Sequence, residues 1–99
     1  MYLIDISLKN ESLSEEEQAK QLDAHRAWFA KYFQQGNFLL LGPYLDKARA
    51  GVIIAQTESR ERLESILAED VYYPNLADYQ IREFKAAMVA ENIQQFQGA

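Results

Sequence analysis

The order of strand-like and helix-like patterns constrains this chain of 99 residues more than any other feature. Tyr2 to Leu8 alternates apolar and polar side chains, which predicts a strand. Two short apolar runs, Phe38 to Leu41 and Gly51 to Gln56, predict two more strands, the second buried on both faces. Ala77 to Lys85 alternates again and predicts a fourth strand.

Two helical patterns separate these strands. Ser14 and Glu17 have the spacing of a capping box, and the helix that follows meets a stop signal at Gly36-Asn37. Its apolar positions are expected to be Leu22, Phe29 and Phe33, with Trp28 and Tyr32 towards the flank. We therefore expect the first three side chains to face the core.

The second helix is capped by Thr57 or Ser59 and ends near Glu69-Asp70. Its apolar side chains Leu63, Ile66 and Leu67 all lie on one face. The complete order is therefore β-α-β-β-α-β, which predicts an α+β ferredoxin-like sandwich: a four-stranded antiparallel sheet with both helices on one face. Right-handed crossovers put the first and third strands in the centre. The open sheet face then favours a homodimer packed sheet to sheet.

We expect a single domain over residues 1–99, with a core at 1–85 and an extension at 86–99. Val89, Ile93 and Phe96 recur at i, i+4 and i+7 in this extension. This pattern predicts a third helix, or an arm laid on the partner subunit.

The composition limits the classes of partner and chemistry that this chain can have. Fifteen acidic against ten basic residues give a net charge of −5, which disfavours nucleic acid as a partner. The absence of cysteine excludes disulfides and thiolate chemistry. Neither a signal peptide nor a membrane span is recognisable, so no membrane association and a cytoplasmic location are expected. No metal or cofactor motif is present.

His25 is the only histidine, and it lies between Leu22 and Phe29 on the inward face of the first helix. A packed histidine satisfied by one hydrogen bond is the simpler interpretation. Asp70 stands at the negative end of the second helix, where a carboxylate is unfavourable unless it has a partner. A carboxylate bonded to one ring nitrogen would make His25 a general acid–base group.

Other candidate residues have equally plausible structural roles. Gly42-Pro43 could give a ligand close access to the backbone, or simply end a strand. Tyr72-Tyr73 could line an apolar pocket, or lie in a dimer interface.

Five segments together resemble the YciI-like, or YCII-related, family of the dimeric α+β barrel superfamily. They are Asp23-Ala24-His25-Arg26, Phe38 to Pro43, Gly51 to Ala55, Leu67 to Tyr72 and Tyr79 to Phe84. The resemblance implies a ferredoxin-like homodimer with a catalytic His–Asp pair, which maps to His25 and Asp70. One departure is Val71, where the family usually has proline.

The resemblance also implies chemistry without a cofactor, because similar proteins act on small cyclic acids or chlorinated aromatics by elimination or isomerisation. We therefore expect a lyase or isomerase in which His25 moves a proton and Asp70 orients it. Gly42, Pro43, Tyr72 and Arg26 are the expected substrate-binding residues. The alternative is a non-catalytic small-molecule-binding or interaction module of the same fold.

Overall fold

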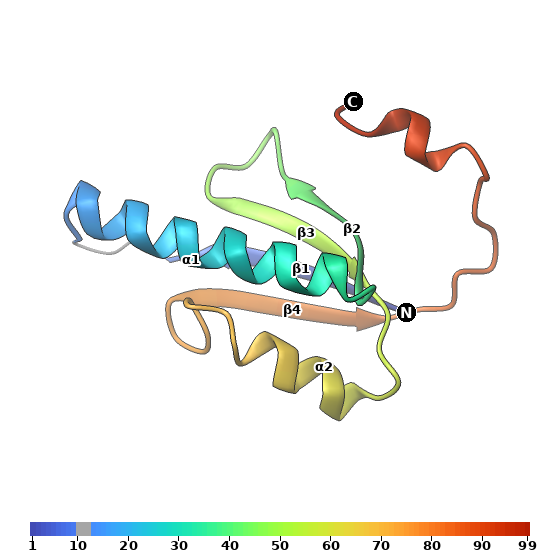
Figure 1. The fold of residues 1–99 in the computed structure, drawn as a ribbon, viewed down its shortest axis with the longest axis horizontal. Helices are drawn as coiled ribbons and strands as arrows, with labels where there is room; N and C mark the ends of the chain where they lie inside the picture. The colour runs from blue at the N-terminus through green and yellow to red at the C-terminus, as the bar shows by residue number, and fades with distance from the viewer. Residues whose placement is uncertain (10–12) are drawn as a thin grey trace.

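The computed structural model describes residues 1–9 and 13–99 and contains one four-stranded sheet with two α-helices (Figure 1). In chain order the elements are β1 (Tyr2–Leu8), α1 (Glu15–Gln34), β2 (Phe38–Pro43), β3 (Ala50–Ala55), α2 (Arg60–Leu67), β4 (Ala77–Glu83) and a 3-10 turn, η1 (Ile93–Phe96). This is the predicted β-α-β-β-α-β order. The ferredoxin-like α+β fold is confirmed.

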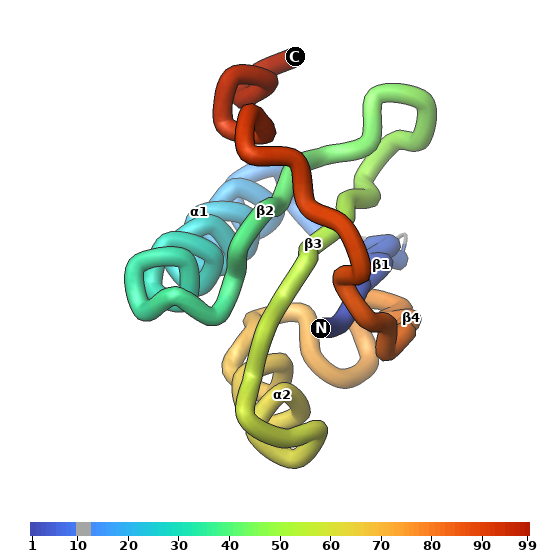
Figure 2. Tube along the Cα trace, turned by 90° about the vertical axis from the view of Figure 1, so that its right-hand side faces the viewer, coloured from blue at the N-terminus to red at the C-terminus, as the bar shows by residue number. Residues whose placement is uncertain are grey.

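The sheet has the strand order β2-β3-β1-β4, with every neighbouring pair antiparallel. The first and third strands are therefore central, as right-handed crossovers predicted. Ile4 of β1 pairs with Ile53 of β3 on one side and Ile81 of β4 on the other. Figure 2 shows both helices on the same side of the sheet, which leaves the opposite face without a helix.

The helix starts follow the predicted chemistry. The Ser14 side chain accepts the Glu17 N–H at 3.1 Å, and the Ser59 side chain accepts the Arg62 N–H at 3.0 Å. Ser59 rather than Thr57 is thus the cap of α2. The Thr57 hydroxyl instead donates to the Ser59 carbonyl at 2.7 Å. Both caps satisfy N–H groups that would otherwise lack a partner within the helix.

The inward face of α1 differs from the prediction. His25, Trp28 and Tyr32 are buried, whereas Leu22 is 36% and Phe33 57% exposed. Trp28 and Tyr32 tolerate burial because their polar atoms find partners. Trp28 Nε1 donates to the Ile66 carbonyl at 2.8 Å, so the buried face of α1 is aromatic. Phe29 packs against the core as predicted, whereas Leu22 and Phe33 stay exposed.

The third strand is buried on one face only. Ile53 and Ala55 point into the core, while Val52 and Ile54 are half-buried on the sheet face without helices. The expectation of burial on both faces is therefore wrong for this chain on its own.

Among the described residues, no helix is long and apolar enough to cross a membrane.

The helix expected over 86–99 does not form. After β4 the chain leaves the sheet and ends away from α1 and α2, with only the short turn η1 (Figures 1 and 2). Met88 is 94% exposed and Val89 67% exposed. Because this segment buries none of its apolar residues, helix propensity alone cannot sustain a helix of this length.

Candidate active site

His25 and Asp70 lie in direct contact although they are far apart in sequence. The Nδ1 atom of His25 is 2.6 Å from Oδ1 of Asp70. The Asp70 side chain has no exposed surface, and that of His25 is 8% exposed. A carboxylate in this position accepts the Nδ1 proton, which leaves the lone pair of the imidazole on Nε2.

The second oxygen of Asp70 is bound by Tyr79, which lies on β4. The Tyr79 hydroxyl donates to Oδ2 at 2.6 Å. Burial, and then the hydrogen bond to Asp70, raise the pKa of Tyr79 well above its usual range, so the hydroxyl keeps its proton. Tyr79, Asp70 and His25 therefore form one hydrogen-bonded chain from the sheet to α1.

Aromatic rings surround the imidazole. The centroid of the His25 ring is 4.2 Å from that of Phe29 and 4.9 Å from that of Tyr72. The Trp28 ring stacks at 5.6 Å. These rings limit the access of water to the His25–Asp70 pair and fix the plane of the imidazole.

The other ring nitrogen of His25 remains accessible. Nε2 has no hydrogen-bond partner among the described residues, yet every fully buried side-chain nitrogen or oxygen in that part of the chain has one. Nε2 is therefore not fully buried. The His25 side chain also lines a cavity of about 390 Å³. This volume suits a small ring compound.

The cavity lies between α1 and the connection from β2 to β3. Arg26, Gly42 and Pro43, three of the residues predicted to bind substrate, line it. Lys47 and Arg49 line it as well, and neither was predicted. These five residues and His25 therefore line one cavity.

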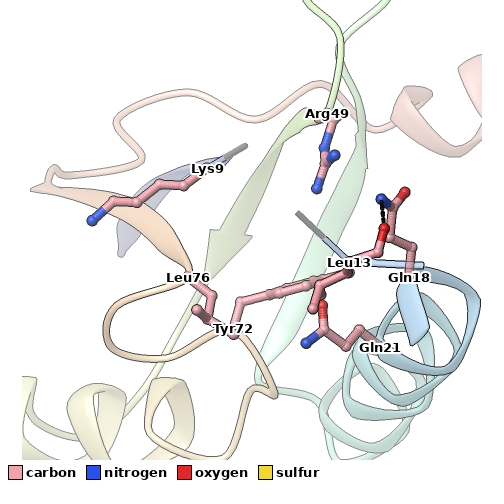
Figure 3. A pocket seen from close by; sticks show the side chains of 7 residues that line it. All are labelled: Lys9, Leu13, Gln18, Gln21, Arg49, Tyr72 and Leu76. Carbon is pink, nitrogen blue, oxygen red and sulfur yellow. Dashed lines mark hydrogen bonds between the residues drawn. The ribbon is translucent and has the colours of Figure 1, made fainter. Parts of the chain in front are cut away.

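Tyr72 occupies a different position. Tyr72 does not line the cavity of about 390 Å³, but its ring packs against the imidazole of His25. It lines a smaller hollow of about 10 Å³. Figure 3 shows this hollow, with Arg49 extending from the hairpin towards Leu13 and Tyr72. Arg49 therefore lines both hollows.

The segment that carries Asp70 is tied to α1 by two neighbouring contacts. α2 ends at Leu67, slightly earlier than predicted, and the Asp70 N–H donates to the Leu67 carbonyl at 3.0 Å. Glu69 accepts from Lys31 Nζ at 2.7 Å and from the Tyr32 hydroxyl. The hydrogen bond from Lys31 lowers the pKa of Glu69, so the two acids at the end of α2 both have partners.

Val71 does not prevent this arrangement. The Tyr73 N–H donates to the Asp70 carbonyl at 3.0 Å, and the Leu76 N–H donates to the Tyr72 carbonyl at 2.9 Å. These backbone bonds hold the turn without a proline at position 71.

The glycine that packing requires is Gly51, not Gly42. A Cβ atom on Gly51 would lie 2.8 Å from the Gly42 carbonyl oxygen, whereas a Cβ on Gly42 would meet nothing within 4 Å. The close approach thus occurs between β2 and β3 beside the cavity. It does not by itself indicate ligand contact at Gly42.

Sequence reasoning missed Tyr79 and Arg49 as site residues. The signal for Tyr79 was present, because the alternation of β4 turns it to the helix side with its cross-strand partner Ile6. Arg49 had no such signal, since its position depends on the shape of the hairpin. Among the described residues, no three histidine or acidic side chains are grouped to hold a metal ion.

Two comparisons with known proteins found similarity. The family model described as YCII-related domain matches residues 1–85. A similar solved structure is the 5-chloro-2-hydroxyhydroquinone dehydrochlorinase from Burkholderia phenoliruptrix, in complex with 2,5-dihydroxybenzoquinone. Its TM-score is 0.60 at 18% identity, over 84% of this chain and 93% of that chain, which shows a shared fold. No curated protein sequence matches.

Proposed function

The chain belongs to the YCII-related domain family, and from that premise we propose that it is a lyase or isomerase acting without a cofactor on a small organic molecule. The substrate is a cyclic acid or an aromatic compound. His25 is the general acid–base group, and Asp70 holds it in the productive tautomer. The observation that carries the proposal is the 2.6 Å contact between Nδ1 and Asp70, combined with the position of His25 in the lining of the cavity.

The chemistry begins with proton removal by Nε2 from a carbon or oxygen of the substrate. The electron pair left on carbon then forms a double bond as a leaving group departs with its own pair, which is an elimination. In the isomerase case the proton returns to a different atom. The imidazolium formed in the first step lies against the Asp70 carboxylate, which stabilises it.

The Tyr79 hydroxyl supports this role because it occupies the second oxygen of Asp70. With both oxygens bound, the carboxylate has little freedom to rotate away from His25. Tyr79 acts through Asp70 and touches no substrate, so we regard it as a positioning residue.

The shared fold with a dehydrochlorinase gives further support for an elimination on a ring. That protein is named for 5-chloro-2-hydroxyhydroquinone and was solved with a quinone. The same reaction class on the present chain would use the 390 Å³ cavity, which is open enough to admit a single ring.

The test is hydrogen–deuterium exchange at acidic C–H groups of a panel of ring compounds, followed by NMR in D₂O. Chloride release from 5-chloro-2-hydroxyhydroquinone is measured in parallel. We expect His25→Ala to lose both signals and Asp70→Asn to lose about 10²-fold or more in rate. Asp23→Asn, a change in an exposed residue of the same helix, is the matched control and should keep the full rate.

Two outcomes oppose the proposal. Exchange that persists in His25→Ala would remove His25 from the chemistry. Binding of panel compounds by wild type and His25→Ala alike, with no exchange in either, would favour the non-catalytic binding module.

We also propose a homodimer formed through the sheet face that carries no helix. Leu40, Ile54 and Leu3 lie side by side across β2, β3 and β1 on that face. Leu40 is 42% exposed in the single chain. A contiguous apolar row of this kind is characteristic of an interface. The exposed apolar residues of segment 86–99 would then form an arm on the partner.

Analytical ultracentrifugation tests the dimer. Ile54→Asp should give a monomer, whereas Leu45→Asp, at a loop position that is 93% exposed, should leave the dimer unchanged. Deletion of 86–99 should weaken dimerisation if the arm contributes. A wild-type chain that sediments as a monomer at high concentration would refute the interface.

A further inference from the structure

The charged side chains that line the His25 cavity are all cationic. They are Arg26 from α1, and Lys47 and Arg49 from the β2–β3 connection. Among the described residues, no aspartate or glutamate lines the cavity, although the chain has 15 acidic residues and only 10 basic ones. A concave site lined by one sign of charge concentrates ligands of the opposite sign.

These cations have no acidic partner in the part of the chain that the structure describes. Lys31 and Arg60 each pair with a glutamate, but no carboxylate of a described residue lies within 4.0 Å of Arg26, Lys47 or Arg49. Lys47 Nζ donates instead to the Ser7 hydroxyl at 2.9 Å. Both guanidinium groups are therefore available for an anion.

Arg49 has a strained backbone. Its φ of 56° is in the left-handed region, and no other described residue except glycine has a positive φ. Its carbonyl accepts the Leu8 N–H at 2.9 Å, and the next carbonyl, of Ala50, accepts the Tyr44 N–H at 2.9 Å. These two bonds hold the strained residue at the start of β3, with its side chain turned towards Tyr72 (Figure 3). Strain that the surroundings impose on one residue is common at functional sites.

Arg26 and Arg49 line the same cavity as His25, and both act electrostatically on Tyr72. Burial raises the pKa of Tyr72, and the charges of Arg49 and Arg26 both oppose that rise. Tyr72 itself packs against His25, with 4.9 Å between the ring centroids.

We propose that Arg26 and Arg49 bind an anionic group of the substrate, a carboxylate or a phenolate, and thereby hold its ring with the reacting atom at His25 Nε2. A guanidinium group matches the geometry of a carboxylate and remains charged at all physiological pH values. This assignment rests on the proposed function, because it defines the substrate class of the same site.

The test compares benzoate with benzamide, two probes of similar shape that differ in charge. His25 is the only histidine, so its imidazole Cε1–H gives a single NMR signal that reports on binding beside Nε2. We expect wild type to bind benzoate at least about ten-fold more tightly than benzamide. Added sodium chloride should weaken benzoate binding and leave benzamide binding unchanged.

Arg26→Gln and Arg49→Gln should each weaken benzoate binding about five-fold or more without affecting benzamide. Arg60→Gln removes the same charge outside the cavity and should behave as wild type. Thermal melts establish that each variant is folded. The assignment would be overturned if wild type bound benzoate and benzamide with equal affinity, or if the His25 signal responded to neither probe. It would also be overturned if the variant with both Arg26→Gln and Arg49→Gln still preferred benzoate.

Failure of the anion site and failure of the catalytic proposal give different results. The indole N–H of Trp28, the only tryptophan, provides a second signal that can be followed in His25→Ala. Benzoate preference in this variant supports the anion site even if no compound undergoes exchange. Exchange by wild type without benzoate preference retains the catalytic proposal and removes the anion site.

Discussion

Replacement of Tyr79 by phenylalanine isolates one hydrogen bond at the centre of the site. The change removes the hydroxyl that donates to Asp70 Oδ2 at 2.6 Å and leaves the ring in place. Hydrogen bonds to charged groups contribute about 1.5–3 kcal/mol. Because the Asp70 side chain has no exposed surface, water cannot replace the lost donor without rearrangement. We expect the free energy of unfolding at pH 7 to fall by that amount.

The loss corresponds to a shift in melting temperature. An unfolding entropy of about 2.1 cal/mol/K per residue over 99 residues gives roughly 0.2 kcal/mol/K, so each kcal/mol lowers Tm by about 5 °C. Tyr79→Phe should therefore melt about 7–14 °C below wild type. Tyr73→Phe is the matched control, because the Tyr73 side chain is beside Tyr79 but its hydroxyl bonds to no described residue.

We also expect the difference in unfolding free energy between wild type and Tyr79→Phe to depend on pH. The folded state raises the pKa of Tyr79 above the value of about 10 for an unfolded chain, so the unfolded state loses the proton first. Stability from this group is complete below pH 10 and falls as the pH rises further. Between pH 9 and pH 11 wild type should lose about 1.4 kcal/mol more than Tyr79→Phe. Urea titrations at both pH values measure this gap, which is the difference in unfolding free energy between wild type and Tyr79→Phe. An unchanged gap, or equal stability at pH 7, would refute this account of Tyr79.

Three further changes test the packing. Gly51→Ala should lower the free energy of unfolding by about 1–3 kcal/mol, because its Cβ would lie 2.8 Å from the Gly42 carbonyl oxygen. Gly42→Ala should cost little, since its Cβ would meet nothing within 4 Å. Similar losses in the two variants, measured by urea unfolding, would contradict this contact. Trp28→Phe should cost about 1–3 kcal/mol because the Ile66 carbonyl loses its 2.8 Å donor, and an unchanged Tm would contradict that role. Val71→Pro should add about 0.4–1 kcal/mol, since the position 71 N–H donates to no described backbone carbonyl; a loss of stability would show that the turn rejects proline.

The topology was predictable because it follows from pattern order and handedness. The central positions of β1 and β3 follow from that order and handedness. The Ser14 cap and the buried row of β1 follow from local sequence. The error on α1 arose because Trp28 and Tyr32 carry polar atoms that the sequence does not show to be satisfied. Their partners, Ile66 and Glu69, come from α2 and from the short segment that follows it, so only the folded structure reveals that both rings can be buried.

The site was partly predictable for a similar reason. His25 and Asp70 were identified from unusual placement and from family resemblance, but the distance between them depends on the packing of α1 against the end of α2. Arg49 was not identifiable, because its left-handed backbone is imposed by hydrogen bonds to β1 and across the hairpin. The helix predicted over 86–99 does not form because its apolar side chains are not covered by any surface of the described residues, although the segment has good helix propensity.

The central place of β1 has a consequence for how the chain folds during synthesis. β1 is made first, but its two neighbours come much later, with Tyr2 beside Ala55 on one side and Glu83 on the other. Such distant pairings slow folding, since a long loop must close before any contact rewards it. Until β4 has left the ribosome, β1 keeps one unpaired edge along its apolar length, and an unpaired edge can join another chain. A nascent chain cut short before residue 77 should therefore aggregate rather than fold.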